Sequence, residues 1–439
     1  MISDEVRKQV LSLIKPNEKE KFSLETQAEE LLSLLQKTAT SLNISSSFFI
    51  GGSFGKGTYL RDSFDVDIFC RFDLSYDDST LSSLAKKILE ATSLNFQIEK
   101  GSRDYYSGSY KSLKFEIVPN YYIESISDAK NSTDYSPYHV EFVKHAAKKN
   151  PQLLDEIRLT KQFFKAQHLY GAESYINGFS GHSIDLLLIY YGSFENFLSS
   201  VKKSWEEVTC IDVAGFYKNQ KDLLSGIDSS KHANLILVDS ILKDRNAAKA
   251  LSEDMYFTLL HLVSNKEEFS YNDFLIKKKT SKQYKEESRS FAQHYGLTQI
   301  QYELSLEDFG SEDIAGSKLL KLLSKVKSYY ASYDFICFSS DFSIFFDEGI
   351  CIYTLYFLDN SLPLVKELQG PHVFRKDAML AFERAKGPCF VRGNRVYAYI
   401  MRDITQLEKI EPLTLDSFKS LSSRSLDFVI SLNHYFYSK

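Results

Sequence analysis

The sequence predicts an α+β fold, and the order of its apolar patterns is the main reason. In the first third of the chain, short apolar strands and amphipathic helices intermix without a strict alternation. Helical periodicity then dominates from about Pro151 to Val263, and strand-like alternation returns beyond it. The expected strands are 47–50, 64–72, 96–100, 113–118, 334–340, 349–358 and 394–402, and the expected helices outside the central stretch are 3–14, 24–43, 78–93 and 317–330.

Length and composition describe a globular protein of more than one domain. The chain has 439 residues, which predicts two to four domains. Hydrophobic residues make up 43% and charged residues 25% of it. The net charge of −5 argues against indiscriminate polyanion binding but allows a local basic stripe. Aromatic residues at 14% supply core and, in addition, stacking platforms for bases.

The cysteines and the N-terminus predict a cytoplasmic protein. Five scattered cysteines without a CxxC pair argue against a disulfide framework or a zinc site and favour a reducing compartment. The N-terminus MISDEVRKQV lacks a signal-peptide pattern, and no apolar run approaches the roughly 20 residues that span a bilayer. We therefore expect no membrane partner.

The most informative stretch is FFIGGSFGKGTYLRDSFDVDIFCRF at 48–72, because two aspartates interrupt its apolar strand. Asp65 and Asp67 are two residues apart, so on a strand they lie on one face. Two carboxylates at that distance repel unless a cation lies between them, and Mg²⁺ prefers carboxylate and phosphate oxygens. A nearby strand, KFEIVPNYY, carries Glu116 between apolar neighbours and supplies a third candidate carboxylate.

The glycines before these aspartates predict a phosphate cradle. Gly51, Gly52, Gly55 and Gly57 let backbone N–H groups form a concave anion site, to which Ser53 adds a hydroxyl and Lys56 a positive charge. A glycine-rich turn alone is most often only a turn, and an isolated DxD is more often a solvated strand edge. Together, at this spacing, they indicate one site that holds a triphosphate beside a metal-binding pair.

Longer motifs carry a resemblance to a known family. GGSFGKGTYLRDSFDVDIF resembles the signature of the nucleotidyltransferase superfamily, which fixes the chemistry but not the substrate. The downstream sequence narrows the choice, and over most of the chain it resembles the archaeal-type (class I) CCA-adding enzymes. The segments that carry this likeness are LYGAE and GFSG within 158–194, SPYHVEFV around His139, VDSILKDRNAAKALS around Arg245, and LQGPHV at 368–373.

The resemblance implies an enzyme that adds C, C and A to the 3′ end of tRNA from CTP and ATP without a nucleic-acid template. It also implies a polymerase-beta-like palm head, a helical neck, and α+β body and tail domains. We expect the head at 1–147, the neck at 148–266, the body at 267–310 and 376–439, and the tail at 311–375. A homodimer is compatible with this family but is left open.

The same resemblance implies roles for individual residues. Asp65, Asp67 and Glu116 would be catalytic and would bind Mg²⁺. The implied nucleotide-binding residues are Gly52, Ser53, Lys56, His139, Lys161, Tyr170 and Arg245, of which Arg245 would face the incoming base. Each also has a structural alternative: His139 as an ordinary helix-start residue, Lys161 as a solvated lysine on an amphipathic helix, Tyr170 as packing, and Arg245 as a capping or surface charge. The basic run 277–285 is either a solvated strand or loop or a contact for tRNA phosphates.

Four positions depart from the family pattern. Glu116 stands where the family has Asp, and Lys56 stands where it has Arg, so a bidentate fork becomes a point charge. Tyr135 replaces an Arg before Ser-Pro, and His182 replaces a Tyr after GFSG. None of these changes removes the chemistry.

Three rival functions remain open from the sequence. A poly(A)-polymerase-like tailing enzyme would share the signature, and so would a catalytically silent RNA-binding relative or a small-molecule nucleotidyltransferase. In the expected reaction, the tRNA 3′-hydroxyl attacks the α-phosphorus of CTP or ATP with two metal ions bound, and pyrophosphate leaves. Recognition of tRNA would rest on shape and backbone contacts, because the major groove of A-form RNA is too narrow to be read.

Overall fold

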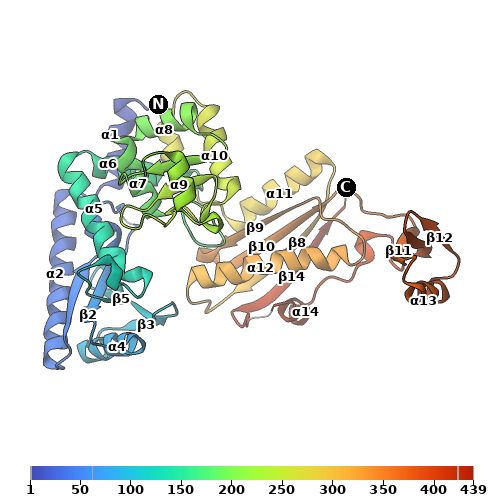
Figure 1. Cartoon of the computed structure of the whole chain (residues 1–439), viewed down its shortest axis with the longest axis horizontal. Helices are drawn as coiled ribbons and strands as arrows, with labels where there is room; N and C mark the ends of the chain where they lie inside the picture. The colour runs from blue at the N-terminus through green and yellow to red at the C-terminus, as the bar shows by residue number, and fades with distance from the viewer. Residues whose placement is uncertain (1, 62, 423–424, 439) are drawn as a thin grey trace. The chain divides into compact units, whose positions relative to one another are not determined.

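The computed structural model describes residues 2–61, 63–422 and 425–438, and it divides into two compact units. Unit 1 is Met1–Lys277 and unit 2 is Lys278–Lys439. Both units combine helices with sheets, which confirms the predicted α+β class (Figure 1). Within the described ranges, no helix has both the length and the apolar character needed to cross a bilayer.

A five-stranded sheet forms the first part of unit 1. Its strand order is β1-β2-β5-β4-β3, with β2 and β5 parallel and the other neighbours antiparallel. Helices α2 and α4 bury their apolar faces against it and against each other (Figure 1). The bounds are β1 Ser46–Ile50, β2 Val66–Phe72, β3 Phe96–Glu99, β4 Tyr105–Tyr110, β5 Leu113–Tyr121, α2 Glu18–Ser41, α3 Gly52–Lys56 and α4 Leu81–Thr92.

Strand alternation divides this sheet into a core face and a second face. On β2, the side chains of Val66, Ile68, Cys70 and Phe72 enter the core with α2 and α4. The intervening residues, Asp67, Phe69 and Arg71, therefore lie on the opposite face. Glu116 lies on that face as well, since it is the register partner of Asp67 on the neighbouring strand. Alternation alone thus places two of the predicted acids side by side.

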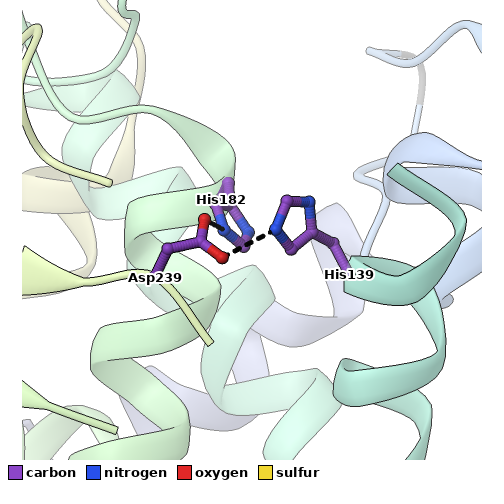
Figure 2. A group of neighbouring side chains, drawn as sticks. All are labelled: His139, His182 and Asp239. Atoms are coloured by element: carbon purple, nitrogen blue, oxygen red, sulfur yellow. Dashed lines mark hydrogen bonds and ion pairs between the residues drawn. The ribbon is translucent and has the colours of Figure 1, made fainter. Parts of the chain in front are cut away.

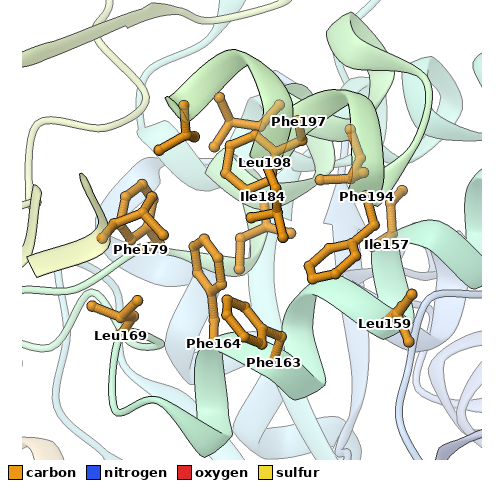
Figure 3. Close-up of a cluster of buried hydrophobic side chains, with 14 of the residues drawn as sticks. Ile157, Leu159, Phe163, Phe164, Leu169, Phe179, Ile184, Phe194, Phe197 and Leu198 are labelled. Carbon is orange, nitrogen blue, oxygen red and sulfur yellow. The ribbon is translucent and has the colours of Figure 1, made fainter. Parts of the chain in front are cut away.

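The rest of unit 1 is a helical bundle around an aromatic core. Phe164 packs edge-on against Phe179 with 4.8 Å between ring centroids, and Phe163 packs against Phe194 at 5.3 Å (Figure 3). This core fixes α6 against α7, and the N-terminal helix α1 packs on the same core. The helices are α1 Asp4–Ile14, α5 Ser136–Lys149, α6 Leu153–Ala166, α7 Gly181–Tyr191, α8 Phe194–Ser204, α9 Gln220–Gly226 and α10 Glu253–Ser264.

A two-stranded parallel sheet is inserted into this bundle. It consists of β6 (Thr209–Asp212) and β7 (Leu235–Val238), and every residue of β7 is buried. Asp239 follows the last residue of β7 and is itself fully buried. The apolar strand therefore delivers a carboxylate to the interior at its carboxyl end.

Unit 2 contains two further sheets. The larger has the order β14-β8-β10-β9, all antiparallel, and α12 buries Leu319, Leu322 and Val326 in its core. The smaller has the order β11-β13-β12, with α13 packed on it. The bounds are α11 Ser281–Tyr295, β8 Thr298–Leu306, α12 Glu312–Ala331, β9 Ser339–Phe345, β10 Ile350–Phe357, β11 Val365–His372, α13 Lys376–Lys386, β12 Cys389–Arg392, β13 Arg395–Met401, α14 Leu415–Ser420 and β14 Val429–Tyr437.

Several sequence-based expectations differ from the structure. The stretch 277–285, expected as a strand or loop, contains the start of helix α11, and the strand expected at 334–340 begins at Ser339. Strands β4, β6, β7, β8, β11, β12 and β14 were not expected. The four-domain division stays a prediction. Its borders at 310/311 and 375/376 do not coincide with those of the sheets, because β8 pairs with both β10 and β14, and β11 pairs with β13.

Candidate active site

The glycine turn is held directly against β2. The N–H of Gly51 donates to the carbonyl oxygen of Asp67 at 2.7 Å. Gly52 has φ +54°, and a Cβ on it would collide with the carboxylate of Asp67. Glycine is therefore required at position 52 both by the backbone conformation and by the close approach. Ser53 and Lys56 follow within the short helix α3. Gly51 and Gly52 thus lie against Asp67, and the single triphosphate and metal site expected from the sequence stays a prediction.

Three carboxylates lie near one another at this site, and the charged forms of Asp67 and Glu116 are disfavoured. Asp67 lies on β2 beside Glu116 on β5, and Asp65 lies two residues before Asp67. Burial, with a contribution from Asp65, raises the pKa of Asp67 to about 6. Burial, with contributions from Asp67 and Asp65, raises the pKa of Glu116 to about 7. Neighbouring carboxylates whose oxygens repel one another are suitable ligands for a hard divalent cation.

Two lysines, Lys56 and Lys161, share one buried carboxylate, that of Asp185. Lys56 Nζ lies 2.8 Å from Asp185 Oδ2, and Lys161 Nζ lies 3.2 Å from Asp185 Oδ1. Lys161 also donates to the hydroxyl of Thr58 at 2.9 Å. Burial alone would raise the pKa of Asp185, but the two ammonium groups hold it below its ordinary value. The group carries a net positive charge, because two lysines face a single carboxylate.

A second buried aspartate, Asp239, is hydrogen-bonded to three basic side chains. Asp239 accepts hydrogen bonds from His139 Nε2 at 3.0 Å and His182 Nε2 at 3.1 Å (Figure 2). It accepts a third from Arg245 Nη1 at 2.8 Å. It also accepts from the backbone N–H of Ile241 at 2.9 Å. Burial opposes ionisation, but the hydrogen bonds from both histidines hold the pKa of Asp239 below its usual range. We call Asp239 and these three side chains the Asp239 hub.

By residue type, the Asp239 hub could also hold a metal, but its contacts favour a hydrogen-bonded cluster. His139, His182 and Asp239 place one ligand atom each within 4.8 Å of one another. Asp239, however, is already bound to the guanidinium of Arg245. Histidine ligands also donate their second ring nitrogen to an acceptor, whereas His182 Nδ1 has no hydrogen-bond partner in the described part of the chain. Burial lowers the pKa of His182 to about 4, so this imidazole is neutral at neutral pH.

These groups converge on one cavity of about 330 Å³ between the sheet and the helical bundle of unit 1. Asp67 lines it together with Lys56, His139, His182 and Arg245. Asp67 therefore shares the cavity with cationic and hydrogen-bonding groups. We call Asp67 and its neighbour Glu116 the acidic corner. The complete lining is Gly52, Lys56, Asp67, Phe69, Ser132, Thr133, Ser136, His139, Val140, His182 and Arg245.

The remaining predicted residues lie around this cavity rather than in its lining. Lys161 is buried, so its alternative as a solvated helix lysine is wrong. Tyr170 forms an isolated β-bridge with Phe179, and burial raises the pKa of its hydroxyl. Asp185 and Asp239 were not predicted as site residues. The signal for Asp239 was an aspartate at the end of the apolar run LILV, within the motif VDSILKDRNAAKALS that also contains Arg245.

Comparisons with known proteins place this site in a family. The family described as "Nucleotidyltransferase domain" matches residues 29–149, and "tRNA nucleotidyltransferase, second domain" matches residues 155–275. The CCA-adding enzyme of Nanoarchaeum equitans is 32% identical over 300 residues, which cover 68% of this chain and 70% of that protein. The chain belongs to the CCA-adding enzymes.

Two further CCA-adding enzymes extend the match. That of Methanocaldococcus jannaschii is 26% identical over 432 residues, covering 96% of this chain and 91% of that protein. That of Sulfolobus acidocaldarius is 36% identical over 204 residues, covering 46% of each chain. The resemblance predicted from the motifs is confirmed, and the protein is a tRNA nucleotidyltransferase.

Proposed function

We propose that this CCA-adding enzyme adds C, C and A to the 3′ end of tRNA, with CTP and ATP as substrates and pyrophosphate as the leaving group. One observation carries the proposal beyond the family name. Asp67, the register partner of Glu116, lines one cavity together with Lys56, His139 and Arg245, so a polyanion and a cation can be held in the same cavity. A nucleoside triphosphate with its divalent cation has this distribution of charge.

Asp65, Asp67 and Glu116 would hold the divalent cation, which we propose to be Mg²⁺ bound as two ions. The bound cation would neutralise charge on the triphosphate and lower the pKa of the attacking hydroxyl. The raised pKa values of Asp67 and Glu116 support this assignment, because a cation removes the repulsion that raises them. Glycine at position 52 leaves the approach to Asp67 open.

The other residues would position the nucleotide. Ser53, Lys56 and the backbone at Gly52 would bind the triphosphate, with Lys161 supplying further positive charge from behind Lys56. His139 and Tyr170 would lie along the phosphate and ribose. Arg245 would face the base, with its guanidinium oriented by Asp239. These side chains do little covalent chemistry; they bind and orient the reactants.

The reaction balances as a phosphoryl transfer. The 3′-oxygen of the RNA forms a bond to the α-phosphorus, and the bond from that phosphorus to the bridging oxygen breaks to release pyrophosphate. We propose that a carboxylate oxygen of Glu116 receives the hydroxyl proton and returns it to water.

The decisive experiment incubates the full chain with tRNA ending at the discriminator base and with CTP, ATP or both. Sequencing of the product 3′ ends should show one or two C residues with CTP alone and CCA with both nucleotides. Long, heterogeneous A tracts would identify a tailing enzyme instead. No pyrophosphate release in the presence of Mg²⁺ would support a silent RNA-binding relative. A cytoplasmic location and a homodimer stay predictions.

A further inference from the structure

A second cavity lies farther along the sheet face that carries the acids. Its volume is about 370 Å³, and it is lined by aromatic side chains around one arginine, Arg71. Arg71 follows Asp67 by four residues on β2, which corresponds to ~13 Å along the strand on the same face. The full lining is Phe49, Arg71, Tyr121, Tyr122, Ile123, Asp134, Pro137, Tyr138 and Glu141.

The guanidinium of Arg71 contacts two aromatic rings but has no counter-ion among the residues that the structure describes. Its central carbon lies 5.1 Å from the ring centroid of Phe49 and 5.1 Å from that of Tyr122. Two aromatic rings therefore contact the guanidinium, and its N–H edge is the part that an anion would bind. Within the described residues, that edge makes no hydrogen bond or ion pair, and its Nε is buried without a partner. Burial lowers the pKa of Arg71.

The other arginines of unit 1 show that this arrangement is unusual in the molecule. Each of them forms an ion pair with a carboxylate: Arg7 with Glu156 and Glu195, Arg61 with Glu20, Arg103 with Asp78 and Asp134, Arg158 with Asp155, and Arg245 with Asp239. A partly buried guanidinium costs free energy unless an anion satisfies it. An external anion can supply what the described part of the chain does not.

The two acids that line the cavity are occupied elsewhere. Asp134 is buried and bound to Arg103, and it also accepts from the backbone N–H of Tyr121 at 2.9 Å. The carboxylate of Glu141 is exposed and lies 3.5 Å from Lys144 Nζ. Neither acid forms an ion pair with Arg71, so the edge of the guanidinium stays available to an anion.

We propose that the Arg71 cavity is a second phosphate site, which binds a backbone phosphate of the RNA substrate while Tyr122 contacts the adjoining nucleotide. The inference rests on the proposed function. A phosphodiester matches the fork of an arginine edge, and aromatic rings such as the half-exposed Tyr122 stack on unpaired bases. The site would hold the strand whose 3′ end reaches Asp67, because both cavities open on one sheet face on either side of the start of α5.

The test compares Arg71→Met with wild type in the full chain. Methionine keeps an aliphatic side chain between Phe49 and Tyr122 but removes the charge and the donors. We expect the KM for tRNA to rise roughly tenfold, with kcat and the KM for CTP unchanged. The salt dependence of binding to a 5′-fluorescein acceptor stem–loop should fall by about one counterion. Binding of CTP alone, measured by calorimetry, should not change.

Matched variants separate a fork-shaped site from general charge. Lys144→Met removes a neighbouring positive charge on α5 and should change the KM for tRNA by less than about twofold. Arg71→Lys should fall between wild type and Arg71→Met, since it keeps the charge but loses the fork. Tyr122→Ala should weaken binding, whereas Tyr122→Phe should not.

Two outcomes would overturn the inference. Equal effects of Arg71→Met and Lys144→Met on RNA binding would show that only net charge matters. A change in CTP binding with RNA binding unaltered would assign the cavity to the mononucleotide. Because the stem–loop binding assay needs no turnover, it remains informative if wild type fails to add CCA, and that failure would count against the proposed function alone.

Discussion

Two groups of carboxylates in unit 1 experience opposite electrostatics. Asp67 and Glu116, the acidic corner, are partly buried, whereas Asp185 and Asp239 are fully buried. In the corner, burial and like charges raise the pKa values to about 6 and about 7. At Asp185 and Asp239, lysines and histidines hold the pKa below its ordinary value despite burial. The charge of the neighbouring side chains, rather than the degree of burial, therefore decides whether the pKa of each carboxylate is raised or lowered.

Under the proposed function, this difference separates residues that would bind an external cation from residues that hold other side chains of the protein in place. The acids of the corner lack enough positive charge from the chain itself, so they are available to a metal ion. Asp185 and Asp239 already have their cations, so their task is to hold Lys56, Lys161 and Arg245 in place. Substitutions in the two groups should therefore fail in different ways.

The largest expected effect comes from Asp67→Asn. This change removes a metal-binding charge, and we expect nucleotide incorporation to fall by roughly 10³-fold or more. The fold should persist, because the amide relieves the repulsion with Glu116. Single-turnover incorporation and stem–loop binding measure the two properties. Near-normal turnover, or loss of RNA binding in parallel with activity, would contradict the assignment of Asp67 to the metal site.

Asp185→Asn should instead destabilise the protein. It leaves two buried ammonium groups without a full counter-charge, and we expect a loss of about 3–5 kcal/mol in the free energy of unfolding. Urea unfolding monitored by circular dichroism measures it. Adding Lys161→Met to Asp185→Asn should recover part of the loss. If the double variant were less stable by the sum of the single effects, the proposed coupling would be absent.

Asp239→Asn should affect the choice and positioning of the nucleotide more than stability. An amide cannot accept from His139, His182 and Arg245 as the carboxylate does, so Arg245 loses its fixed orientation. We expect kcat/KM for CTP and ATP to fall by about 10- to 100-fold, with more misincorporation. Asp244→Asn in the same loop is the control. Asp244 is exposed, and its contact with Lys231 is weak, since the two charged groups lie 3.8 Å apart. Equal effects of the two substitutions would remove the special role of Asp239.

The acidic corner was predictable from the sequence because its signals are local. The glycines, Asp65 and Asp67 lie within 17 residues of one another in a strand context, and Glu116 is a lone acid in an apolar strand. The contacts of Asp185 and of the Asp239 hub join residues that are far apart in the sequence. Lys56 and Asp185 are 129 residues apart, and His139 and Asp239 are 100 apart, so only the packing of α5, α6 and α7 brings them together. Apolar periodicity does not encode such pairings.

Helix α11 was missed for a related reason. Its buried residues are Ser281, Tyr284, Ser288 and Ala292. Two of these four are serines, which a search for apolar periodicity does not count. They are satisfied inside the fold: the hydroxyl of Ser281 donates to Glu348, and that of Ser288 accepts from Gln301. Polar residues that find partners in the tertiary structure can form a helix face without an apolar pattern.

The smallest expected effect tests the acidic corner through its pH dependence. With divalent cations chelated, the folded state keeps protons on Asp67 and Glu116 that the unfolded chain releases above about pH 4. Raised folded-state pKa values therefore make these two groups cost stability as pH rises, and the loss is complete above about pH 7. Asp185 and Asp239 act in the opposite sense, so the wild-type Tm alone does not isolate the corner.

The informative quantity is the difference in Tm between Glu116→Gln and wild type. In chelator it should grow in favour of the variant by ~2–4 °C between pH 5 and pH 8, because glutamine carries no charge to repel Asp67. Saturating Mg²⁺ at pH 8 should reverse the difference, since only wild type retains the full set of cation ligands. A difference that is independent of pH, or unchanged by Mg²⁺, would mean that these acids neither repel one another nor share a cation.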